Sequence, residues 1–160
     1  MKWIKIHKNL WLGLWWLGFV FFFMQELPYA IMPFIKSANP LMKMIDTYPV
    51  LNIIEKIAGI STVIAMIFIV NPNAKRFPLD SIKERIYLLL SVLLLLGYYV
   101  GWVLYFNGYQ SLCLVLIMLV GFVPLYYTFI GLWRKNYILV CVGILFLFAH
   151  IANVWTSYVI

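Results

Sequence analysis

The sequence predicts an all-α integral membrane protein, a bundle of five transmembrane helices that forms a single membrane domain over residues 1–160. Hydrophobic residues make up 66% of the chain and charged residues 11%, whereas soluble domains contain roughly 45–50% and about 25%. Five apolar runs are each long enough for a membrane-crossing helix, which takes about 20 residues. Most of the basic residues outside these runs fall on one side of the membrane if the chain crosses it five times.

Each predicted span is an apolar run between polar, charged or helix-breaking residues. The first begins at Asn9, after three lysines, and ends at about Leu27, immediately before Pro28. The second contains Glu55 and Lys56 in its first turns, where such side chains can reach the membrane surface. The third follows a charged loop, and the turn NGYQ separates it from the fourth. The predicted spans are 9–27, 51–70, 86–106, 111–133 and 137–158.

The basic residues predict the orientation of the chain. Nine of the 12 Lys and Arg residues fall in the N-terminal tail, in the loop between the second and third spans, and in the turn at 134–135. With five spans these three segments share one side of the membrane, and Lys and Arg collect on the cytoplasmic side. We therefore expect a cytoplasmic N-terminus, an external C-terminus and a multi-pass protein of the plasma membrane. The abundance of Ile, Lys and Tyr is typical of a bacterial protein.

The segment 36–50 is too polar to cross the membrane and too apolar for a free loop. Pro40 and Pro49 bracket a stretch in which apolar side chains alternate with Lys43 and Asp46. Amphipathic segments of this kind lie at the membrane surface. We expect a short helix or turn at the outer interface.

Small residues predict where the helices pack, because helices in lipid approach closely through Gly, Ala, Ser and Thr. Gly97 and Gly101 form a GxxxG pair in the third span, and Pro124 is expected to kink the fourth. The glycine pair favours a contact inside the bundle, and a homodimer is the alternative. The tryptophans predicted to form the aromatic belts at the span ends are Trp3, Trp11, Trp102, Trp133 and Trp155.

Ionisable side chains inside membrane spans are rare and are functional candidates by default. Glu26 and His150 fall in the first and fifth spans. At a rise of about 1.5 Å per residue, Glu26 lies about 27 Å beyond Lys8, and His150 lies about 22 Å beyond Lys135. We therefore expect both in the outer half of the bilayer at matching height, with Glu55 close to the same level.

Polar residues around these two positions predict a pocket that opens outward. His150 and Asn153 share one face of the fifth span. Pro28 deprives the Met24 carbonyl of its helical partner, and a helix broken at this depth faces a cavity. Glu26 would supply the negative charge, with His150 as its partner. The predicted ligand- or proton-binding residues are Gln25, Glu26, Tyr29, Tyr98, His150 and Asn153.

A structural role for the same two residues is the alternative. Glu26 would then mark the end of the first span and face lipid headgroups. His150 would be an interior histidine, bonded to a tyrosine or to a backbone carbonyl.

The sequence favours a membrane protein that binds a small molecule, lipid or ion, as a transporter component or sensor. An accessory or immunity-type interaction protein without a ligand site is the alternative. An intramembrane enzyme acting on a lipid-linked substrate is disfavoured, because no catalytic motif occurs. We expect no catalytic residue, metal site, cofactor or nucleic-acid partner. The expected partners are the lipid bilayer, a small hydrophobic or lipid ligand, and further copies of the chain or a membrane partner subunit.

Overall fold

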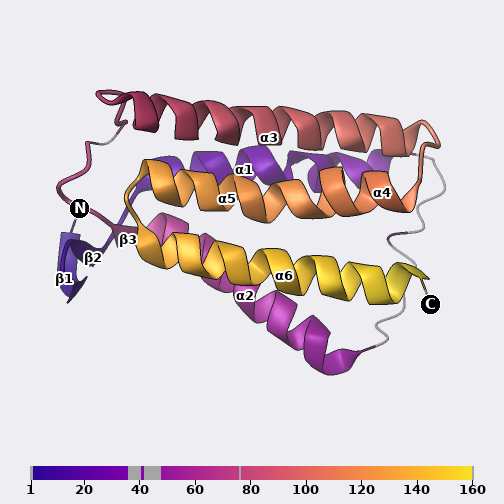
Figure 1. Ribbon diagram of the computed structural model, residues 1–160, viewed down its shortest axis with the longest axis horizontal. Helices are drawn as coiled ribbons and strands as arrows, with labels where there is room; N and C mark the ends of the chain where they lie inside the picture. Colours follow the sequence, from indigo (N-terminus) through magenta and orange to yellow (C-terminus); the bar gives the residue numbers. More distant parts are fainter. Residues whose placement is uncertain (1, 36–40, 42–47, 76, 160) are drawn as a thin grey trace.

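The computed structural model describes residues 2–35, 41, 48–75 and 77–159. In these ranges, five helical segments are long and apolar enough to cross a membrane, as the sequence predicts. They run back and forth along the long axis of the molecule, so the two termini lie at opposite ends of the bundle (Figure 1). The five segments are Trp16–Phe34, Pro49–Phe68, Ile82–Phe106, Leu112–Trp133 and Tyr137–Ser157.

The first span starts later than the sequence predicts, because residues 9–15 are not helical. Strands β1 (Lys2–His7) and β2 (Leu10–Gly13) form an antiparallel hairpin, and β2 also pairs with β3 (Ile69–Val70). The aromatic and β-branched residues of β1 favour a strand. The decisive contact is β3, which lies about 60 positions further along the chain and ties the hairpin to the end of the second span.

Helix α1 (Trp16–Ile31) does not break at Pro28, contrary to the prediction. Proline leaves the carbonyl four residues earlier without its helical donor. Here the Tyr99 hydroxyl donates to the Met24 carbonyl, so the helix continues without an unsatisfied backbone group. The chain then tightens into the short 3₁₀ helix η1 (Met32–Phe34), which begins around Pro33.

Helices α2 (Pro49–Phe68) and α3 (Ile82–Phe106) start earlier than predicted. Pro49 opens α2, where a missing backbone N–H is tolerated. At the start of α3, the Ser81 hydroxyl and the Glu84 carboxylate form a capping box with each other's backbone N–H groups. Most of the predicted interfacial segment, 36–40 and 42–47, lies outside the described residues, so that expectation stays a prediction.

The fourth span is one continuous helical segment with an irregular first half. It begins as α4 (Leu112–Leu114), widens into the π-helical segment η3 (Val115–Gly121) and continues as α5 (Phe122–Trp133). The sequence places a kink at Pro124, and the irregular turns directly precede that residue. Proline cannot donate a backbone hydrogen bond, and both prolines and π turns are sites at which helices kink.

The fourth span is also the centre of the bundle. In its most apolar window 56% of the residues are buried, compared with 22–33% in the other four spans. Helix α5 lies between α3 and α6 (Tyr137–Val159), and α2 crosses α6 at an angle (Figure 1).

The glycine pair of α3 makes an internal contact, as the sequence favours. A side chain at Gly97 would overlap the Phe122 ring, and one at Gly101 would overlap Met118. These close approaches bring α3 against η3 and α5. Trp102 and Trp133 were predicted in the aromatic belts, but they are 3% and 0% exposed and belong to the core.

One end of the bundle carries most of the described basic side chains, and we call it the basic end. It consists of the β1–β2 hairpin, residues 69–75 and 77–85, and the turn at 134–136 (Figure 1). Arg134 is buried there, with its guanidinium 4.7 Å above the Trp15 ring and bonded to the Lys75 carbonyl. Burial lowers the pKa of Arg134 to about 10, so the side chain remains charged at neutral pH. Asn136 donates to the Ala65 and Ile69 carbonyls.

Replacement of Gly101 by alanine should destabilise the bundle. The new Cβ would lie 2.8 Å from Met118 Cβ and 3.0 Å from Leu119 Cδ2. Overpacking costs typically about 1–3 kcal/mol, which exceeds the gain of up to about 1 kcal/mol in helix propensity. Thermal unfolding of the purified protein in detergent measures the effect.

Val103→Ile is the matched control, because it adds a methylene group at a position of the same helix that is 60% exposed. We expect it to leave the melting temperature unchanged. Equal melting temperatures for Gly101→Ala and wild type would contradict the close approach of α3 to η3.

Candidate functional site

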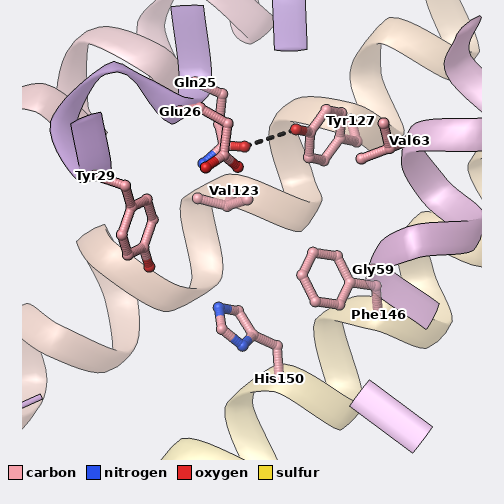
Figure 2. A pocket seen from close by; sticks show the side chains of 9 residues that line it. All are labelled: Gln25, Glu26, Tyr29, Gly59, Val63, Val123, Tyr127, Phe146 and His150. Atoms are coloured by element: carbon pink, nitrogen blue, oxygen red, sulfur yellow. Dashed lines mark hydrogen bonds between the residues drawn. The ribbon is translucent and has the colours of Figure 1, made fainter. Parts of the chain in front are cut away.

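A pocket of about 270 Å³ lies between four helices near the middle of the bundle. Figure 2 shows Gln25 and Glu26 of α1 on one side of it and Phe146 and His150 of α6 on the other. Tyr29 lies at its flank. The lining residues are Gln25, Glu26, Tyr29, Gly59, Val63, Val123, Tyr127, Phe146 and His150.

The pocket contains four of the six residues that the sequence places at a binding site. Gln25, Glu26, Tyr29 and His150 line it. The other two, Tyr98 and Asn153, are absent from its lining: Tyr98 lies one hydrogen bond behind it and Asn153 lies two. Tyr98 contacts Gln25, and Asn153 contacts a carboxylate that also binds His150.

Gln25 is fixed by hydrogen bonds at both ends of its side-chain amide. The Tyr127 hydroxyl donates to Gln25 Oε1 at 2.6 Å, and Gln25 Nε2 donates to the Tyr98 hydroxyl at 3.4 Å. The Gln25 side chain is buried, and a buried amide without partners would cost free energy. These bonds therefore hold one wall of the pocket in a defined position.

Two further tyrosine hydroxyls bond to backbone carbonyls of α1 and so attach this helix to α3 and α5. Tyr126 donates to the Phe21 carbonyl at 2.8 Å, and Tyr99 donates to the Met24 carbonyl. Both carbonyls lie on the turns that precede Glu26. The rotation of α1 that presents Glu26 to the pocket is thus set by side chains of α3 and α5.

Glu26 provides a carboxylate that is available to a ligand. It lies about 15 Å along the helix from Trp16, near the middle of the first span, because α1 starts at Trp16 and continues past Pro28. This position does not fit the alternative in which Glu26 marks the end of the span and faces headgroups. The described part of the chain contains no hydrogen bond or ion pair to its carboxylate.

His150 pairs with Glu55 of α2, which corrects the prediction that Glu26 would be its partner. His150 Nδ1 lies 2.7 Å from Glu55 Oε1, and the Asn153 amide donates to Glu55 Oε2. The Phe146 ring stacks on the imidazole, with ring centroids 4.9 Å apart. We refer to Glu55, His150 and Asn153 as the Glu55 cluster.

The sequence contained a signal for the Glu55 cluster. Glu55 occurs at nearly the same depth in the membrane as His150. His150 and Asn153 share one helical face, and their polar groups need hydrogen-bond partners on a neighbouring helix. Sequence periodicity does not specify which carboxylate faces that surface, because the choice depends on the neighbour of α6. In the structure the neighbour is α2, which crosses α6.

The Glu55 cluster leaves the imidazole with one nitrogen for a ligand. Nδ1 is engaged by Glu55, so in the neutral form with Nδ1 protonated, Nε2 is an acceptor. The contact with Glu55 fixes the orientation of the imidazole ring, so Nε2 is the nitrogen that remains for a ligand.

Comparisons with protein-family models, curated proteins and solved structures found no match. The function is therefore argued from the pocket and its chemistry. Among the described residues, no group of three or more His, Cys, Asp or Glu side chains is arranged to hold a metal ion.

Replacement of Glu55 by alanine should destabilise the protein. It leaves His150 Nδ1 and the Asn153 amide without their acceptor, and orphaning partly buried donors costs about 1–3 kcal/mol. The neighbouring change Lys56→Ala is the control, because Lys56 is exposed and substitutions at such positions usually fall within about 0.5 kcal/mol. Melting temperatures in detergent compare the two. Equal losses would show that the Glu55 cluster does not support the fold.

Proposed function

We propose that this protein binds a small organic cation in the pocket between α1, α2, α5 and α6, and that it acts as a transporter component or sensor in a bacterial plasma membrane. The observation that carries the proposal is the Glu26 carboxylate, which lines a pocket within the spans. A carboxylate in such a place is costly and usually serves a ligand or ion.

The other walls of the pocket suit an organic cation. Tyr29 and Phe146 offer aromatic rings, which attract cations through their π faces, and the Tyr127 hydroxyl borders the same space. Gly59, Val63 and Val123 supply apolar surface for the remainder of the ligand. A volume of about 270 Å³ limits the ligand to a small molecule.

The orientation of the chain in the membrane belongs to the same proposal. The basic end would face the cytoplasm, since Lys and Arg favour that side. The pocket would open to the outside past Tyr29, which follows Glu26 by one turn toward the opposite end and is 44% exposed.

A complete transporter usually contains internal repeats, so transport would require further copies of the chain or a partner subunit.

Thermal unfolding of the full chain in a neutral detergent tests the binding of a cation. The probes are choline, tetramethylammonium and guanidinium, with sodium as the inorganic reference. A ligand at about 100 times its Kd stabilises the folded state by about 2.7 kcal/mol, which should raise the melting temperature by several degrees. Glu26→Gln should abolish this rise, because it removes the charge and keeps the shape.

Lys56→Gln is the matched control, since Lys56 also carries a charge within a span but does not line the pocket. Its protection by the cation should equal that of wild type. Equal protection of wild type and Glu26→Gln would refute the proposal, and a lack of protection by every cation would favour an accessory protein without a ligand site.

A further inference from the structure

A second pocket lies at the basic end, away from the site described above. Its volume is about 410 Å³, and it is enclosed by the tip of the β1–β2 hairpin and by the turn that leads into α6. His7 and Lys8 contribute from the hairpin, Lys135 from the turn, and Ile138 and Val142 from the first turns of α6. Basic groups thus lie next to the apolar surface of a helix that is suited to cross a membrane.

The two lysines of this pocket have unusual backbone conformations. Lys8 has a φ of 38° and Lys135 a φ of 54°, and they are the described non-glycine residues with positive φ. Glycine or asparagine adopts this region more readily, so a lysine there carries local strain. Lys8 lies in the turn of the β1–β2 hairpin and Lys135 lies in the turn after α5, and both turns border the same pocket.

The excess positive charge of the pocket comes from Lys8. Lys135 pairs with the Glu84 carboxylate at 3.0 Å, so these two charges offset each other. Lys8 forms no ion pair within the described ranges and is exposed at the hairpin tip. A negatively charged group entering the pocket would therefore meet the Lys8 ammonium, with Lys135 and His7 beside it.

The apolar part of the pocket extends along the membrane span. Ile138 and Val142 are four residues apart, so they share one face of α6. Both are only partly buried, which leaves this strip of helix accessible from the side. A ligand that carries an anionic group and a hydrocarbon chain would satisfy both parts of the pocket.

We propose that this pocket binds an anionic phospholipid, with its headgroup phosphate at Lys8 and an acyl chain along Ile138 and Val142. Basic pockets at the cytoplasmic ends of spans are suited to anionic headgroups. The bound lipid would connect the hairpin to α6 at the leaflet on the basic end. This site is separate from the cation pocket and does not depend on it.

The experiment compares lipids by thermal unfolding and by native mass spectrometry of the full chain in a neutral detergent. The probes are phosphatidylglycerol, phosphatidylcholine and the water-soluble headgroup analogue glycerol 3-phosphate. We expect phosphatidylglycerol to bind and to raise the melting temperature, whereas phosphatidylcholine and glycerol 3-phosphate should do neither. The glycerol 3-phosphate arm separates a lipid site from a site for free phosphate.

Lys8→Asn is the decisive variant, because asparagine tolerates positive φ and removes the charge. It should fold as well as wild type and bind phosphatidylglycerol roughly fivefold more weakly, as expected for one lysine near an anionic headgroup. Lys8→Arg should restore binding. Lys83→Asn is the matched control, since Lys83 is exposed at the same end but does not line the pocket.

Three results would overturn the proposal. Equal losses in Lys83→Asn and Lys8→Asn would indicate diffuse attraction to the whole basic end. Equal binding of phosphatidylcholine and phosphatidylglycerol would remove the role of charge. Protection by glycerol 3-phosphate as strong as that by the lipid would show a phosphate site without a role for the acyl chain.

Discussion

The polar groups of a helix within a bilayer have no water to bond to, and the packing of α1 follows from this constraint. Helix α1 is the least buried of the five spans, so apolar packing alone gives it little definition. Tyrosine hydroxyls from α3 and α5 instead bond to its backbone carbonyls and to Gln25. They compensate for Pro28 and fix the rotation of the helix. The Glu26 carboxylate is directed to the pocket as a result.

On the opposite wall of the pocket, charged and polar side chains likewise satisfy one another's hydrogen bonds. Glu55 accepts from His150 and from Asn153, so the carboxylate of α2 and the polar face of α6 satisfy one another. The pocket therefore lies between two walls that are held by hydrogen bonds. A ligand would meet side chains that are already positioned, which lowers the entropic cost of binding. It would also meet one carboxylate, that of Glu26, which the described residues do not neutralise.

The basic end holds together segments that are distant in sequence. At the basic end, the hairpin, the buried Arg134 and Asn136 connect segments that are distant in sequence. These bonds keep the ends of α1, α2, α5 and α6 together. Helix α2 crosses α6 at an angle (Figure 1), and the pocket lies between α1, α2, α5 and α6.

The sequence by itself determined the five spans, the alternating direction of the chain and the internal use of the glycine pair, because hydropathy, loop charge and residue size are local properties. It also brought Gln25, Glu26, Tyr29 and His150 into one expected site through their depths in the spans. Only the tertiary structure decided that His150 pairs with Glu55, that Tyr98 and Asn153 lie behind the pocket, and that the first residues form a hairpin. Those features depend on which helix lies beside which and on how each is rotated, and a tyrosine or a strand distant in sequence supplies the deciding hydrogen bond.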